Sequence, residues 1–215
     1  TALPELTGQL TLDLNQGNSI SRGLATAAGA HVHVHSANST IRGQNTVANG
    51  TLRADDSSFA MGEMTVTTGG RIEGLGHVGA LTIASGGTVA PGHSPGTIYA
   101  GSTTWAGGGT YEWEVNRTNA IAGGDPGWDL LSIDGDLDIA ATAQSKFTIR
   151  VISLTTDNQP GAVAEFNQQV TTKWPLVEVS GSINNFSADA FAINTNAFVN
   201  FTGNGTFSVT TEDGT

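Results

Sequence analysis

Three histidines alternate along one short segment, at His31, His33 and His35. In an extended strand, neighbouring members of this set lie about 7 Å apart on one face. Two imidazoles at that spacing can chelate zinc, copper or nickel, and a functional site also needs a carboxylate from an adjacent segment. The plainer alternative is an outward polar row of a strand, and we predict this row without a metal. The carboxylates considered for a metal site are Asp13, Asp55 and Asp56.

A second group of candidate ligands is acidic. Oxygen-rich turns can hold calcium, but the spacing matches neither an EF-hand loop nor the Gly-Gly-x-Gly-x-Asp nonapeptide of calcium-binding solenoids. The last three members alternate in sequence, which is typical of one solvated strand face. We therefore predict no metal and no cofactor here. The group consists of Asp125, Asp129, Asp134, Asp136 and Asp138.

Glu112 and Glu114 form the one carboxylate pair that suggests catalysis. They share a strand face, and glycoside hydrolysis uses two closely placed carboxyl groups. The same spacing is also expected of surface positions that alternate with the apolar Tyr111, Trp113 and Val115. The chain has no Gly-x-Ser-x-Gly nucleophile motif, and its glycine pairs precede strands rather than phosphate-binding helices. We predict no catalytic residues and a protein that is not an enzyme.

Composition narrows the class of protein. The 215 residues carry a net charge of −11 with only 8 Lys and Arg, which disfavours nucleic acids and anionic membranes as partners. Charged residues make up 13%, against roughly 25% in ordinary soluble domains, so Thr, Ser, Asn and Gln must supply the polar surface. There is no cysteine, and no apolar run approaches the length of a membrane-spanning helix. Because the chain starts at Thr1, we expect a mature chain whose leader has been removed, or an artificial boundary.

The elements that position these residues are repeated strands. Glycine, any residue and then an apolar β-former recur, with Ala30 replacing the glycine in one copy. The spacing of 17 to 26 residues is typical of coils that bury their apolar faces by stacking on each other. Short alternating runs such as 10–14, 32–35, 64–67 and 81–83 support strands. The apolar positions are 10, 32, 52, 72, 89, 111 and 137.

These patterns predict an all-β fold, a parallel β-helix, with regular coils over residues 1–139. Residues 140–215 differ, because seven of the eight phenylalanines lie at or after Phe147. We expect this part to hold the last coils plus a Phe-rich capping element or a small β element, since a solenoid end must be covered. Strands are predicted at 147–154, 174–179 and 206–210, and a loop with one short helical turn at 155–170.

Two stretches resemble a known family. Residues 80–115 read ALTIASGGTVAPGHSPGTIYAGSTTWAGGGTYEWEV, and residues 127–139 read GWDLLSIDGDLDI. Together they are similar to the passenger regions of bacterial autotransporters with autotransporter-associated β-strand repeats, and to surface proteins that end in a PEP-CTERM sorting tail. The resemblance covers about 60 residues well. It implies a right-handed parallel β-helix on the cell exterior, but it implies no particular activity.

Three functions remain open from the sequence. The first is an extracellular structural protein of the bacterial surface or biofilm matrix, which self-associates through strand edges into fibres or a layer. The second is an adhesin or carbohydrate-binding module that stacks surface glycans on exposed aromatic rings. The third is a polysaccharide-active enzyme. The rings that would form the sugar-stacking strip are Trp105, Tyr111, Trp113 and Trp128.

Overall fold

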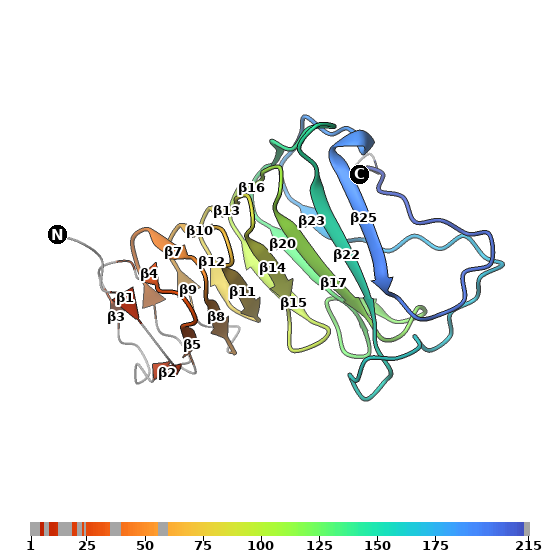
Figure 1. The fold of residues 1–215 in the computed structure, drawn as a ribbon, viewed down its shortest axis with the longest axis horizontal. Helices are drawn as coiled ribbons and strands as arrows, with labels where there is room; N and C mark the ends of the chain where they lie inside the picture. Colours follow the sequence, from red (N-terminus) through yellow and green to blue (C-terminus); the bar gives the residue numbers. More distant parts are fainter. Residues whose placement is uncertain are drawn as a thin grey trace.

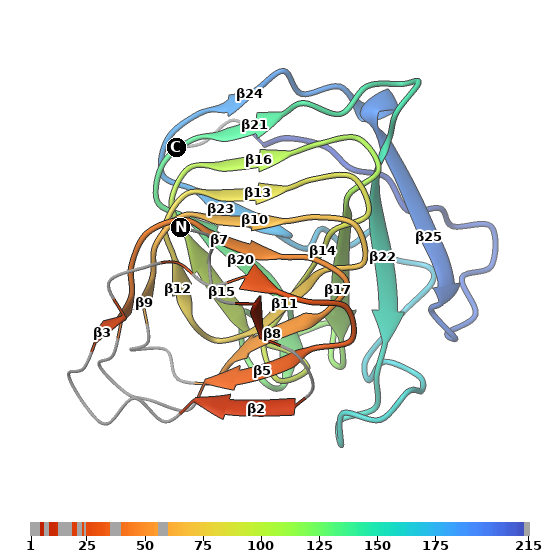
Figure 2. The ribbon, with the colours of Figure 1, turned by 60° about the vertical axis from the view of Figure 1, so that its left-hand side comes forward.

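A computed structural model describes residues 5–6, 9–12, 19–20, 23, 25–34, 40–55 and 60–212. Over these residues the chain winds into a parallel β-helix, so the predicted all-β solenoid is confirmed. Successive strands visit three sheets, named here A, B and C, and each coil lays one strand on every sheet. The coils stack along the long axis from the N-terminal to the C-terminal end (Figure 1), and the three walls enclose one core (Figure 2).

Sheet A contains eight parallel strands, most of them only two or three residues long. In stacking order they are β1 (Glu5–Leu6), β4 (Ala25–Thr26), β7 (Asn45–Val47), β10 (Met64–Val66), β13 (Leu81–Ile83), β16 (Thr103–Trp105), β21 (Leu137–Ile139) and β24 (Ile183–Asn184).

Sheet B is the longest wall, and its strands lengthen towards the C-terminal end. Its parallel strands are β2 (Gln9–Leu12), β5 (His31–Val34), β8 (Thr51–Ala54), β11 (Arg71–Gly74), β14 (Thr88–Pro91), β17 (Thr110–Val115), β22 (Phe147–Ser153) and β25 (Phe191–Ala197). An excursion between β17 and the next strand of sheet C adds β19 (Gly127–Trp128), antiparallel to β17, and β18 (Ile121–Ala122) beside it.

Sheet C closes the third side. Its strands are β3 (Ser19–Ile20), β6 (Thr40–Ile41), β9 (Ala60–Met61), β12 (His77–Val78), β15 (Thr97–Ala100), β20 (Leu130–Ile133) and β23 (Val177–Val179).

Helix is almost absent from the described part of the chain. It holds one 3-10 turn, η1 (Ala188–Ala190), and no helix there is long and apolar enough to cross a membrane. The helical turn predicted within 155–170 is wrong, because that segment forms loops and turns. The strand predicted at 206–210 is also wrong. This segment pairs with no sheet and lies over the end of the stack instead.

The repeating glycine has a steric cause. It stands at the corner between sheets A and B, where its N–H donates to the carbonyl three residues earlier, as Gly70 does to Thr67 and Gly87 to Ala84. A Cβ on Gly70 would lie 2.1 Å from the carbonyl oxygen of Val47 in the preceding coil. This close approach of stacked backbones explains the glycine at Gly70, while Ala30 occupies the equivalent corner of an earlier coil.

The register confirms most of the repeat. Leu10, Val32, Leu52, Ile72, Val89 and Tyr111 are aligned one above another in sheet B. The seventh position was assigned wrongly, because Leu137 lies in sheet A beside Thr103. Tyr111 instead aligns with Ile149, since the β18–β19 excursion lengthens this coil beyond the spacing of the earlier ones.

The core changes along the stack. Early coils are filled by Val, Ile, Leu, Ala and Met, whereas the later coils bury Trp105 stacked on Phe147 with ring centroids 4.5 Å apart. The last sheet strands, β22 to β25, continue the three sheets beyond residue 139. The end of the core is then covered by aromatic side chains from loops, with ring contacts between Phe166 and Phe198 and between Phe198 and Phe207.

Candidate functional site

Charged and imidazole side chains gather on the outer face of sheet B. Alternation along each strand turns every second residue outwards, and the register stacks these residues coil upon coil. The result is a chain of ion pairs that crosses from β5 to β22, which we call the charge ladder. Its members are His33, Arg53, Asp55, Arg71, Glu73, His93, Glu112 and Arg150.

Asp55 is the centre of the N-terminal half of the ladder. It contacts His33 of the coil before, and its Oδ1 lies 2.6 Å from Nε of Arg53 and 2.5 Å from Nε2 of His93. Burial alone would raise the pKa of Asp55, but its bonds to Arg53 and His33 outweigh burial and lower the pKa below its ordinary value. Asp55 is therefore held ionised between three coils.

Glu112 is the centre of the C-terminal half. Arg71 reaches it from two coils away, and Nη1 of Arg150 lies 2.5 Å from its Oε1 in the next coil. Burial would raise the pKa of Glu112, yet the two guanidinium groups lower it overall. Arg71 also holds Glu73, with 2.6 Å between Nε and Oε2, so its charge is shared between two carboxylates.

A small hollow of about 80 Å³ opens beside the ladder, under the Pro91–Gly96 turn. It is lined by Arg71, Glu73, His93 and Ser94, among others, and by Glu114 from the strand below. Burial raises the pKa of Glu114 above its ordinary value, and a hydrogen bond from Ser94 opposes that rise in part. The pKa values of Glu112 and Glu114 are therefore shifted in opposite directions although the two residues share one strand face.

Asp129 ties this turn to sheet B. Its side chain is fully buried, and its two carboxylate oxygens accept hydrogen bonds from the backbone N–H groups of Gly96 and Glu114, both at 2.9 Å. Burial, followed by the neighbouring Glu114, raises the pKa of Asp129, and the two N–H donors act against this. Asp129 is thus a buried clamp on the Pro-Gly turn rather than a member of an open acidic cluster.

The other aspartates of the predicted acidic group do not gather around one point. Asp125 is bonded to Asn116 and Asn158. Within the described ranges no group of three His, Cys, Asp or Glu side chains is placed to hold a metal ion. Each of the remaining three aspartates accepts a hydrogen bond from a residue of the next coil, which connects the two coils. These contacts are Asp134 to Ser180, Asp136 to Ser182 and Asp138 to Asn185.

Of the histidine row, the structure describes His31 and His33. His31 is exposed, and His33 contacts Asp55, one of the three carboxylates considered at the start. His35, Asp13 and Asp56 lie outside the described residues. His33 therefore belongs to the charge ladder.

The proposed sugar-stacking strip is contradicted by burial. The four rings are at most 7% exposed, so none presents a face to solvent. Trp113 donates its indole N–H to the carbonyl of Asp129, and the hydroxyl of Tyr111 donates to the carbonyl of Leu176. The long strands of the wide C-terminal coils need large inward side chains to fill them, and these rings do that. The four residues are Trp105, Tyr111, Trp113 and Trp128.

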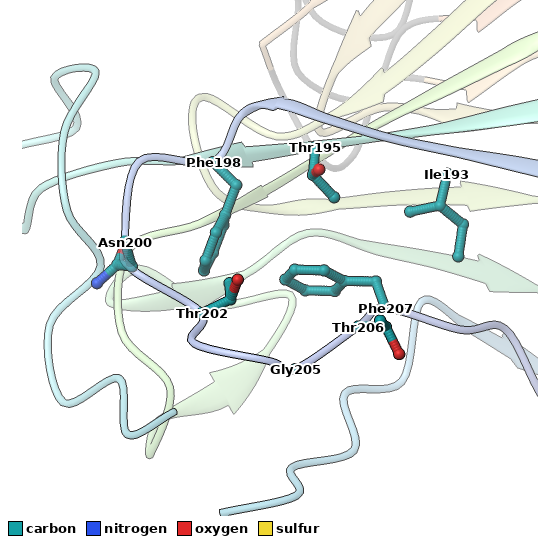
Figure 3. Close-up of a pocket in the computed structure, with 8 residues that line it drawn as sticks. All are labelled: Ile193, Thr195, Phe198, Asn200, Thr202, Gly205, Thr206 and Phe207. Carbon is teal, nitrogen blue, oxygen red and sulfur yellow. The ribbon is translucent and has the colours of Figure 1, made fainter. Parts of the chain in front are cut away.

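A larger groove lies at the C-terminal end of the stack (Figure 3). It has a volume of about 310 Å³ and opens between β25 and the segment 198–207. Ile193 and Thr195 of β25 face it with Phe198 beside them on the same side, and the ring of Phe207 enters it from the opposite side. Nearby in sequence, Val199 and Phe201 are 61% and 78% exposed. The cap therefore covers the core without sealing it.

Sequence reasoning missed three residues that the fold makes prominent. His93 joins the ladder although it sits in a Pro-Gly turn, and Arg71 spans two coils to reach its partner. Tyr99 is exposed and stacks on His77. The neighbour of Tyr99 depends on a pairing between coils of unequal length.

No protein-family model matches the chain, and no curated protein is similar to it by sequence. What can be said of its role therefore comes from the arrangement of its own residues.

Proposed function

We propose that this protein is an extracellular structural protein of the bacterial surface or biofilm matrix, which self-associates through the ends of its β-helix into fibres or a layer. The observation that carries the proposal is the state of the terminal strands. At the C-terminal end β23, β24 and β25 each pair with one strand only among the described residues, as β1, β2 and β3 do at the other end.

Unpaired strand edges favour addition of further strands, and soluble proteins normally block them with charges, prolines or covering segments. β25 carries no charged residue along its length, Phe191–Ala197. The segment beside it leaves a groove rather than a paired strand. The exposed Val199 and Phe201 add apolar surface at the same end.

The ladder favours a structural role as well. Each of its members is engaged by another member from its own or a nearby coil, so it cross-links the stack along its axis. A carboxylate pair for glycoside hydrolysis would need one group free to donate a proton and space for the sugar. Glu112 is instead held by two guanidinium groups, and the hollow that Glu114 lines is small.

The proposal is tested by placing a charged side chain at the C-terminal end of the stack. Thr195 is exposed at the end of the stack and faces the groove, so Thr195→Lys places an ammonium group where a second copy would add its strand. The matched control is Thr148→Lys, on the outer side of β22, one strand in from the end. We expect wild type and the control to form assemblies visible by electron microscopy and sedimentation, and Thr195→Lys to remain monomeric.

Wild-type protein that is monomeric at every concentration would refute the proposal. Equal assembly by all three proteins would refute the C-terminal edge as the contact.

A further inference from the structure

A second feature of the surface lies on sheet C, on a different wall from the charge ladder. The register there stacks Ala60, His77, Tyr99, Ser132 and Glu178 in one outward row, one residue for each coil. Inward residues of the same strands, such as Val78 and Leu131, are buried in the core. The row therefore runs along the outside of the solenoid, parallel to its axis.

The two rings of this row lie face to face. The His77 and Tyr99 centroids are 4.4 Å apart and their planes differ by 8°. That separation is close to the distance of about 4.8 Å between neighbouring strands, so each ring occupies the height of one coil. Such stacking leaves the second face of Tyr99 turned towards the next coil, and this side chain is 39% exposed.

The next coil has no ring at this position. Ser132 follows Tyr99 in the row, and its short side chain cannot cover the tyrosine ring. Glu178 follows Ser132 one coil further on, and it is exposed. Two strand spacings, about 10 Å, therefore separate the level of Tyr99 from that of Glu178. At the level of Ser132 the row therefore carries no ring, with the Tyr99 ring one coil before it and the Glu178 carboxylate one coil after it, and we call this level of the row the gap.

We propose that this gap binds one pyranose unit of a neutral polysaccharide. The apolar face of the sugar would stack on Tyr99, as amphipathic rings do on aromatic side chains. The hydroxyl of Ser132 and the carboxylate of Glu178 would hydrogen-bond its hydroxyl groups. The net charge of −11 disfavours anionic ligands such as uronic acid polymers and nucleic acids.

This site is distinct from the buried strip rejected above, and it does not depend on self-association. It would let a structural solenoid hold the glycans of a surface or matrix along one wall. Because Tyr99 and Glu178 are both exposed on the outside of the solenoid, a long chain could cross the row without needing an end.

The experiment tests the site in two ways, by placing a second aromatic ring in the gap and by removing the ring of Tyr99. Purified wild type is titrated with cellohexaose, xylohexaose, mannohexaose and chitohexaose, with hexagalacturonate as the anionic comparison, and binding is followed by NMR shifts. Ser132→Tyr places a ring over the open face of Tyr99. The matched control, Ala60→Tyr, places a ring at the other end of the stack, beyond His77.

We expect at least one neutral hexasaccharide to bind. Tyr99→Ala and Ser132→Tyr should each weaken it by about tenfold or more, and Ala60→Tyr should leave it unchanged. Failure of all four neutral sugars to bind, equal binding of hexagalacturonate, or full binding by Ser132→Tyr would each overturn the proposal. If Tyr99→Ala changed only the association state of the protein, the gap would be a protein contact and the sugar site would be wrong.

Discussion

At the residue scale, Glu112 and Glu114 show how neighbours decide ionisation. The two carboxylates lie two positions apart on one strand face, and both are partly buried. Arg71 and Arg150 overcome the cost of burial at Glu112 and lower its pKa, whereas Glu114 has no guanidinium at bonding distance and its pKa is raised by burial. The two side chains should therefore affect stability in opposite directions.

The first prediction concerns Glu112→Gln. A lowered pKa in the folded state means that Glu112 stabilises the fold above the pKa of the unfolded chain, and that this stability is lost as pH falls through the lowered value. The variant should lose about 1–2 kcal/mol of unfolding free energy at pH 7, because two charge-assisted bonds are weakened at a partly exposed site. The loss should shrink when both proteins are unfolded at pH 3. A loss that is independent of pH would contradict the ion-pair explanation.

The matched prediction is Glu114→Gln. A raised pKa means that the protonated form suits the fold, so stability from this group is present below the pKa of the unfolded chain and is lost as pH rises through the raised value. The variant removes a buried charge beside Asp129 and keeps an acceptor for Ser94. Its melting temperature should rise at pH 7 and match wild type at low pH. A lower melting temperature at pH 7 would show that the charge is needed.

At the element scale, the corner between sheets A and B is the repeating unit of the fold. Corners stack by backbone bonds from coil to coil, as Gly69 donates to Gly86 and Gly86 to Gly108. The residue in each corner with positive φ is glycine or Asn49, and the next residue is the repeated glycine, or Ala30 after Gly29. The first residue has a left-handed backbone, and at Gly70 the second has no room for a Cβ.

These two requirements can be separated by substitution. Gly70→Ala should lower the unfolding free energy by about 2–3 kcal/mol, since its Cβ would overlap the Val47 carbonyl and the backbone would have to move. Gly29→Asn should cost roughly 1 kcal/mol or less, because its φ is +74° but no atom lies within 4 Å of the added Cβ. Melting temperatures of the two variants are the measurement. Equal losses would mean that backbone conformation, and not close approach of coils, sets the glycine pattern.

At the scale of the whole molecule, the net charge and the open strand edges have opposite effects on self-association. Stacked coils leave strand edges at both ends, which favours end-to-end contact, while a net charge of −11 repels identical copies. Salt shortens the range of that repulsion, from about 30 Å at 0.01 M to about 8 Å at 0.15 M.

Self-association should therefore increase with ionic strength. Light scattering of one protein concentration in 10 mM and 300 mM NaCl should show larger particles at high salt. The Thr195→Lys variant should show no such increase. Particles that dissociate as salt rises would point to an interface held by ion pairs, contrary to a contact made by strand edges.

The sequence by itself determined the class of fold and the register of the first coils. Coils stack on their nearest neighbours only, so a local pattern of glycine and alternating apolar residues repeats wherever the coil length is nearly constant. The pattern failed at Leu137, because the excursion after β17 changed the coil length and placed that residue on another sheet.

The tertiary structure decided which outward residues meet and which polar groups are buried. Alternation predicted that Glu112 faces outwards, but its partner Arg71 comes from another coil and is set by register, as is the contact between Tyr99 and His77. Asp129 seemed part of an exposed acidic cluster, yet the Pro91–Gly96 turn and β17 enclose it. The type of a residue limits the bonds that it can make, and only the stacking of coils decides which of those bonds form.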